Sequence, residues 1–212
     1  QAVQQAAVSV DNTLDTMRSQ LNAITGAIRQ GGTMEQITER VRTLADARES
    51  LCAVMVYNEE GDIRLCTGSK YPLKKTIYKD LSFDRSLLGA AGDFTVSRPH
   101  VETIFNGAFL WVVTVATRLE QPVCGDGVYV AVDFRLSALA QYIDRVSVGR
   151  RGYCYIVDSR GEIIYHPQQQ VLFAGLKTES ETPAAELESD VYTQKNAIKA
   201  VAVTDDGRWQ IV

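Results

Sequence analysis

The chain has 212 residues, 45% of them hydrophobic, and a formal net charge of −4. This length allows one large domain or two of about 100 residues, and the composition is typical of a soluble, globular protein. The lysines and arginines are scattered and form no clustered basic face, which argues against nucleic acid as a partner. No stretch approaches the roughly eighteen apolar residues that a membrane-spanning helix needs.

The two ends of the sequence suggest a fragment of a longer protein. The chain starts with QAVQQ, without an initiator methionine or a signal peptide, and it stops inside the apolar run RWQIV. We therefore expect further segments on both sides of it.

The cysteines do not indicate a metal site. None of them has the C-x-x-C spacing of a zinc or redox centre: Cys52, Cys66, Cys124 and Cys154. We expect no bound metal and no cofactor. Cys52 and Cys66 flank one predicted hairpin, where they are either a disulfide pair or two buried thiols.

The first thirty residues predict a long helix. Its apolar residues recur at alternating spacings of four and three, as in the seam of a coiled coil: Val10, Leu14, Met17, Leu21, Ile24 and Ile28. Such a seam packs either along its own domain or against a second copy in a homodimer. Gly31-Gly32 ends this helix, and the capping-box spacing from Thr33 to Gln36 predicts a second one, with one apolar side: Met34, Ile37, Val41 and Leu44.

From Leu51 the period changes to that of strands. The runs LCAVMVY (51–57) and IRLCTG (63–68), joined by a turn at 58–62, predict a β-hairpin. The region 69–100 is polar and irregular, with helical potential around 79–91.

Two more strands are predicted just after the middle of the chain. They are NGAFLWVVTVATRL (106–119) and GVYVAVDF (127–134), joined by the turn-rich segment EQPVCGDG. The segment RLSALAQYIDRVSV then predicts a helix that leads away from these strands.

The second half of the chain repeats the plan of the first. The hairpin GYCYIVDSRGEIIYHP (152–167) matches the first hairpin when Gly161 is placed under Gly61, and AIKAVAVTDDGRWQIV (197–212) matches the later strand pair. Each half is therefore a small antiparallel sheet with one side covered by helix or loop, which makes the fold class α+β.

Two such units after a long helix resemble the double Cache domain, a PAS-like extracytoplasmic sensor of bacterial histidine kinases, chemoreceptors and cyclic-dinucleotide enzymes. The resemblance is carried by GRRGYCYIVDSRGEIIYHP, SRPHVETIFNGAFLWVVTVA and GVYVAVDFRLSAL. It implies helices over 1–50, a membrane-distal unit over 51–134, a connecting helix over 135–150, and a membrane-proximal unit over 151–212 that is truncated at its C-terminal end.

The resemblance also implies a function. The chain would be the sensor of a transmembrane receptor, most similar to the sensors of histidine kinases, with flanking transmembrane helices outside this sequence. An unknown small molecule would bind the distal unit and shift the helices. The family's sensors have no chemistry of their own.

Amino-acid-binding members of the family hold the ligand carboxylate with an arginine and a tryptophan, and the ammonium with a tyrosine and an aspartate. Asp133 matches that aspartate, and His100 falls where the tyrosine would be. The Arg-x-Trp element is missing, since LSFDRSLLGAAGDF has Arg85 alone. The predicted ligand-binding set is Asp133, His100, Arg85, Arg98 and Tyr129.

The first four of these residues also have a plain structural interpretation. Asp133 would cap a helix beginning near Phe134, His100 would be an exposed loop histidine, and the two arginines would be solvated or ion-paired. We expect Trp111 in the core and His166 in a structural role. We also expect Tyr153, Tyr155 and Tyr165 to pack the sheet.

Two other classes of function compete with the sensor. Catalysis lacks support, because the sequence has no G-x-S-x-G elbow, phosphate loop, H-E-x-x-H motif or cysteine with a nearby histidine. A dimerisation or protein-interaction module without a ligand would account for the helical seam and the missing ligand motif.

Overall fold

The computed structural model describes residues 2–75, 94–138, 140, 152–158, 163–168, 191–194, 197–204 and 209–212. The chain divides into two compact units. Unit 1 comprises Gln1–Asp15 and Ser137–Val212, and unit 2 comprises Thr16–Leu136. The domain boundaries expected from the sequence stay a prediction.

Helix α1 (Ala2–Arg29) is the predicted N-terminal helix, and its apolar seam is buried within its own chain. All six seam residues, from Val10 to Ile28, are at most 5% exposed. This burial supports packing of the seam along its own chain. A homodimer through α1 stays a prediction. Neither helix bounded in the described part of the chain combines the length and apolar character needed to cross a bilayer.

Helix α2 (Met34–Asp46) begins with the predicted capping box. Thr33 Oγ1 accepts the N–H of Gln36, and the Gln36 side chain accepts the N–H of Thr33. Ile37 and Val41 are buried as expected, but Met34 is 42% exposed, because it lies in the first turn, at the edge of the buried stripe. The two glycines before the cap have φ angles of 69° and 112°, which end α1.

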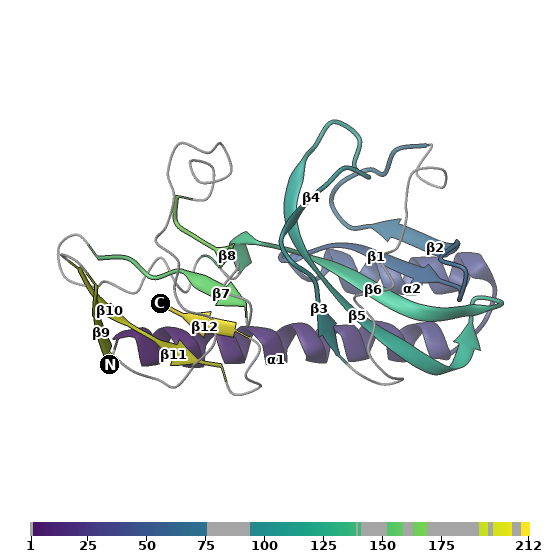
Figure 1. The fold of residues 1–212 in the computed structure, drawn as a ribbon. Coiled ribbons are helices and arrows are strands. Elements are labelled where there is room, and N and C mark those ends of the chain that lie inside the picture. The colour runs from purple at the N-terminus through teal and green to yellow at the C-terminus, as the bar shows by residue number, and fades with distance from the viewer. Residues whose placement is uncertain are drawn as a thin grey trace. The chain divides into compact units, whose positions relative to one another are not determined.

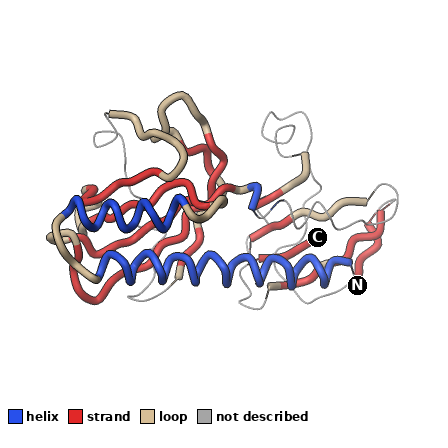
Figure 2. The backbone as a smooth tube through the Cα atoms, turned by 180° about the vertical axis from the view of Figure 1, so that it is seen from behind, coloured by secondary structure: helices blue, strands red, loops and turns tan. Residues whose placement is uncertain are grey.

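Unit 2 contains an antiparallel sheet of six described strands (Figure 1). The order is β2-β1-β6-β5-β3, and β4 also pairs with β5. The strands are β1 (Leu51–Tyr57), β2 (Ile63–Gly68), β3 (Thr95–Val96), β4 (His100–Glu102), β5 (Leu110–Val123) and β6 (Gly127–Arg135). Figures 1 and 2 show α2 and the adjoining part of α1 along one face of this sheet.

The sequence predicted β1, β2, β5 and β6 but missed two short strands. β3 and β4 fall in a stretch whose residues show no clear alternation, and their pairing with the long β5 makes them strands. β5 also runs to Val123, four residues further than expected, because Cys124 and Gly125 form the turn with φ angles of 53° and 93°. The predicted helical potential at 79–91 lies outside the described residues.

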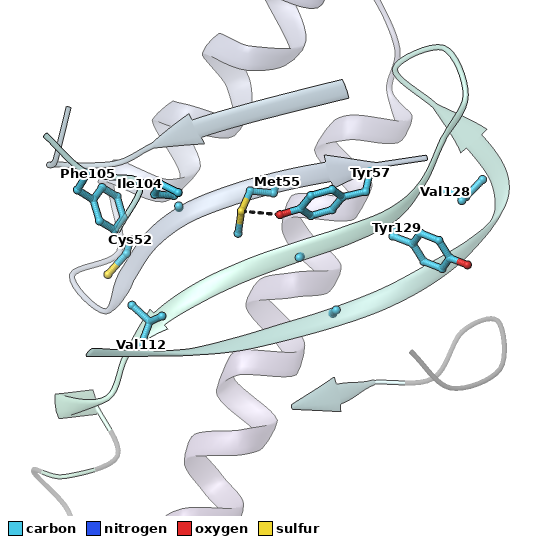
Figure 3. Packing of buried hydrophobic residues seen from close by; sticks show 11 residues of the cluster. Cys52, Met55, Tyr57, Ile104, Phe105, Val112, Val128 and Tyr129 are labelled. Carbon is cyan, nitrogen blue, oxygen red and sulfur yellow. Dashed lines mark hydrogen bonds between the residues drawn. The ribbon is translucent and has the colours of Figure 1, made fainter. Parts of the chain in front are cut away.

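The register of the sheet places the polar residues on one face, and we call the face that carries Asp133 and Thr114 the inner face. Asp133 pairs with Ala53 on one side and Thr114 on the other. The next rung pairs Met55 with Ala131 and Ala131 with Ala116, and paired residues share a face. Figure 3 shows Met55 on the side of the strands turned away from α1.

Unit 1 carries the second sheet, with the described order β11-β12-β7-β8, and a separate β9-β10 pair. The strands are β7 (Ile156–Asp158), β8 (Ile163–Tyr165), β9 (Val191–Gln194), β10 (Ala197–Ala200), β11 (Ala202–Val203) and β12 (Trp209–Ile211). The antiparallel β7-β8 pair confirms the repeated hairpin, and the α+β class is confirmed for the chain. β9 was not predicted. Most of the expected connecting helix lies outside the described residues.

The cysteine thiols are free. In the β1-β2 register Cys66 lies opposite Met55, three residues from Cys52, so the two thiols do not face each other directly across the hairpin. Burial raises the pKa of Cys52 to about 11 and that of Cys66 to about 12. Both thiols therefore stay protonated at neutral pH and are poor nucleophiles.

Candidate functional site

Three neighbouring strands of unit 2 bring polar side chains together on the inner face. His100 and Glu102 are two positions apart on β4, so they point to the same side of that strand. Thr114 on β5 pairs with Asp133 on β6. The strand order β4-β5-β6 therefore brings together His100 and Asp133, which lie 33 positions apart in the sequence.

Asp133 is completely buried. Its Oδ1 accepts a hydrogen bond of 2.6 Å from the Thr114 hydroxyl, while its Oδ2 has no hydrogen-bond partner among the described residues. Burial raises the pKa of Asp133 to about 7, and the nearby Glu102 carboxylate acts in the same direction. A buried carboxylate with one unpaired oxygen is costly, which marks Asp133 as a binding candidate.

Glu102 is held by the backbone that follows it. Its Oε1 accepts the N–H groups of Thr103 at 2.7 Å and Ile104 at 3.0 Å. Its Oε2 lies 3.8 Å from His100 Nε2, an ion-pair distance. Burial acts to raise the pKa of Glu102, but His100 and the two N–H donors outweigh it and the pKa is lowered. Glu102 is therefore the ionised member of the two carboxyl groups.

His100 is held by its other ring nitrogen. Nδ1 lies 3.1 Å from the Arg98 carbonyl oxygen, which can only accept, so Nδ1 carries a proton. Nε2 lies 3.5 Å from Thr114 Oγ1 and faces Glu102. The interaction with Glu102 raises the pKa of His100, against the opposing effect of burial. With 42% of its side chain exposed, His100 is the solvent-facing member of the cluster.

We name His100, Glu102 and Asp133 the acidic cluster. One nitrogen or oxygen atom from each of the three lies within 4.8 Å of the others. These atoms are lone-pair donors around one point, and two of the three residues are carboxylic acids. The cluster therefore favours a positively charged group, which can be a proton, an ammonium or a metal ion.

The structure corrects one interpretation of Asp133. The sequence left open that Asp133 caps a helix beginning near Phe134. β6 continues through Arg135 instead, and the Asp133 carboxylate contacts Thr114 on the neighbouring strand. Because the strand is one residue longer than expected and continues past Asp133, Asp133 sits inside the sheet and not at its end.

The predicted ligand-binding residues do not all meet in one place. Asp133 and His100 lie together. Tyr129 lies four positions from Asp133 along β6, and its hydroxyl donates to Glu59 Oε2 at 2.8 Å instead. Arg98 is exposed, and it is its carbonyl that contacts His100. Arg85 lies outside the described residues.

Sequence reasoning missed Glu102 and Thr114. Glu102 forms an H-x-E pattern with His100, and this alternation becomes informative only when the segment is known to be a strand. Thr114 lies inside an apolar run, where a hydroxyl opposite an aspartate is a signal only once the register is known. Both residues depend on pairings between separate segments.

The structural interpretations of the remaining residues can also be compared with the fold. His166 is 1% exposed, its Nδ1 accepts the N–H of Gln168 at 2.9 Å, and the Tyr153 ring packs edge-on at 5.0 Å. Tyr155 and Tyr165 are buried as expected, whereas Tyr153 is 38% exposed. Trp111 is half-buried on β5, at the margin of the core.

Comparison with solved structures places the fold among bacterial ligand-binding domains. The ligand-binding domain of the Pseudomonas aeruginosa PAO1 amino acid chemoreceptor PctB, in complex with L-Arg, has a TM-score of 0.72 at 17% identity, over 99% of this chain and 90% of that one. The corresponding domain of P. aeruginosa PctC, in complex with GABA, has a TM-score of 0.69 at 14% identity, over 99% and 94%. That of Pseudomonas fluorescens CtaA with L-valine has 0.66 at 14%, over 99% and 93%.

Comparison with curated proteins finds no match. The family model described as Cache domain (dCache_1) matches residues 1–212. Domains of this family are extracytoplasmic sensors of membrane receptors. The match spans both units and all the segments on which the resemblance rested, and the chain therefore belongs to the double Cache family.

Proposed function

We propose that unit 2 binds a small molecule through a cationic group, with Asp133 as the counter-ion, and that this binding is the input of an extracytoplasmic receptor. The observation that carries the proposal is the buried Asp133 carboxylate with its unpaired Oδ2. A group of this kind destabilises the unliganded fold unless a ligand supplies the missing donor.

An ammonium group fits this environment. It has three N–H donors, and Asp133, Glu102 and His100 offer acceptor atoms within 4.8 Å of one another. L-Arg, GABA and L-valine, the ligands named for the similar structures, all carry an ammonium group. The Arg-x-Trp element for a carboxylate is absent from the sequence, so we infer that amines as well as amino acids are candidate ligands.

The remaining predicted contacts belong to the same proposal. Arg98 lies between β3 and β4, two residues before β4 begins, and Arg85 lies in the segment before β3. Either guanidinium would suit a ligand carboxylate, in place of the missing arginine and tryptophan pair. Tyr129 is a less direct candidate, since its hydroxyl already donates to Glu59.

The signal would leave unit 2 through α1. Residues 2–15 of this continuous helix belong to unit 1 and residues 16–29 belong to unit 2. A ligand that favours one arrangement of the helix by a few kcal/mol would shift the receptor between states. We propose a histidine kinase as the output. A chemoreceptor is the second candidate, because the similar solved structures are chemoreceptor domains.

The test is a thermal-shift screen of this chain against amino acids, amines, small carboxylates, sugars and purines, in buffer with EDTA. A ligand at a hundred times its Kd adds about 2.7 kcal/mol of stability, which raises the Tm of a chain of this size by about 5–10 °C. Asp133→Asn should remove the shift. Asp126→Asn, at an exposed aspartate in the same unit, should retain it.

The result can also favour the competing interpretation. If no compound in the library shifts the Tm, or if Asp133→Asn leaves the shift intact, ligand binding at Asp133 is wrong. A module for dimerisation or protein interaction then becomes the better account of the domain.

A further inference from the structure

Each residue of the acidic cluster uses one side-chain atom to fix its position and presents another. His100 Nδ1 donates to the Arg98 carbonyl, and Glu102 Oε1 accepts two backbone N–H groups. Asp133 Oδ1 accepts the Thr114 hydroxyl. The three side chains are therefore held in place before any ligand arrives.

In neutral His100 with its proton on Nδ1, the three atoms not used for positioning are all electron-pair donors to a cation. They are His100 Nε2, Glu102 Oε2 and Asp133 Oδ2. Nε2 and Oε2 are 3.8 Å apart, and Oδ2 is buried without a hydrogen-bond partner in the described part of the chain. The Thr114 hydroxyl cannot satisfy Nε2, because its single proton is directed at Asp133.

We propose that His100, Glu102 and Asp133 form a binding site for a divalent transition-metal ion such as Zn²⁺. A ligating histidine commonly donates its second ring N–H to a backbone carbonyl, as His100 does to Arg98. Tetrahedral Zn²⁺ with ligands at about 2.1 Å separates them by about 3.4 Å. The separation of 3.8 Å between Nε2 and Oε2 is close to that value.

The chemical types of the three ligands also indicate which metal ions fit the site. Ca²⁺ and Mg²⁺ take oxygen ligands, whereas one imidazole with two carboxylates suits Zn²⁺ and other transition metals. The protein supplies three ligands, so water or another small ligand would complete the coordination sphere. Thr114 acts as a positioning residue, because it orients the Asp133 carboxylate without binding the metal itself.

This inference goes beyond the proposed function, since it needs all three residues and concerns a metal ion. Both proposals use Asp133 Oδ2, so metal and ammonium would exclude each other. The conditions of the two experiments separate the proposals, because Zn²⁺ binding is measured without an amine and amine binding is measured in EDTA.

The experiment measures Zn²⁺ binding to the metal-free chain by isothermal titration calorimetry, for wild type and three variants. His100→Gln and Glu102→Gln each remove one ligand, and the partial exposure of His100 makes its variant safe for folding. Glu39→Gln on α2 removes an exposed carboxylate far from the cluster in sequence and serves as the control. We expect one bound ion per chain and affinities more than tenfold weaker in His100→Gln and Glu102→Gln.

Absorption spectra of the Co²⁺-loaded chain identify the ligand atoms. We expect no thiolate-to-metal charge-transfer band, because the cluster supplies nitrogen and oxygen only. The proposal is overturned if Zn²⁺ does not bind, if either variant binds it as tightly as wild type, or if the spectrum shows thiolate ligation. Amine binding in EDTA with no Zn²⁺ binding would refute the metal site and leave the proposed function intact.

Discussion

The chain has two histidines, one in each unit, and their surroundings differ sharply. His166 in unit 1 is buried, its Nδ1 accepts a backbone N–H, and its ring packs against Tyr153 and Tyr155. His100 in unit 2 is half-exposed, and its Nε2 faces a carboxylate and a hydroxyl. The same side chain is thus part of the packing in one unit and part of a charged cluster in the other.

The difference follows from the strands that carry the two residues. β5 has 14 residues and β6 has 9. β5 is long enough to pair with β6 on one side and with β3 and β4 on the other, which brings His100 toward Asp133. β7 and β8 have three residues each, and His166 directly follows β8. The two units share one architecture but differ in role, because the charged side chains lie together in unit 2, which has the wider sheet.

Replacement of His166 should have the largest effect on stability. His166→Ala removes ring contacts with two tyrosines and leaves the Gln168 N–H without its acceptor, so unfolding should become easier by about 2–4 kcal/mol. The chain has two tryptophans, Trp111 in unit 2 and Trp209 in unit 1. Urea unfolding followed by Trp209 fluorescence in a Trp111→Phe background reports on unit 1. An unchanged midpoint would show that His166 does not support its unit.

Asp133→Asn should stabilise unit 2 at high pH. The pKa of Asp133 is raised to about 7 in the folded chain, against about 3.9 in an unfolded chain. The stability that comes from protonated Asp133 is therefore present below about pH 4 and is lost as the pH rises toward 7. In EDTA at pH 8 the variant should be more stable than wild type by about 2 kcal/mol.

The measurement is urea unfolding of wild type and Asp133→Asn between pH 5 and pH 8. The difference in unfolding free energy should grow with pH. Parallel curves would mean that Asp133 is not titrating over this range, which would remove the electrostatic contrast between the two units.

Thr114→Val should cost about 1–2 kcal/mol at pH 8, because Asp133 then loses its hydroxyl donor while remaining buried. Thr117→Val is the matched control, since Thr117 is on the same strand and the opposite face. Thermal unfolding of both variants gives the comparison. Equal effects of the two substitutions would show that the hydrogen bond to Asp133 contributes nothing specific.

His100→Gln should have the smallest effect on stability. His100 is half-exposed and its ion pair with Glu102 is 3.8 Å long, so the unfolding free energy should change by about 0.5 kcal/mol or less. His166→Ala should therefore lower the unfolding free energy much more than His100→Gln does. A large loss in His100→Gln, measured in the same urea experiment, would make His100 a packing residue like His166.

Local pattern predicted much of the fold. The a/d seam of α1, the capping box of α2, and the alternating runs of β1, β2, β5 and β6 are all signals within one segment. β3, β4 and β9 escaped prediction, because strands of two to four residues have too few positions to show a period, and pairing defines them.

The site was predictable in part, for a related reason. The resemblance to amino-acid-binding members of the family pointed to Asp133 and His100. Glu102 showed no sequence signal of its own, because its role depends on β4 pairing with β5. Tyr129 shares a strand with Asp133, but side chains four positions apart on an extended strand are well separated, and Tyr129 bonds to Glu59 instead.

The sequence by itself determined most of the elements, the repeated plan and the family, since these follow from periodicity and from motifs read along one segment. Only the tertiary structure decided where the α1 seam packs and which polar side chains meet. Those outcomes depend on strand order and register, which place residues 100, 102, 114 and 133 on one face. Contacts between distant segments are set by the free energy of the whole sheet, and no single segment of the chain contains that information.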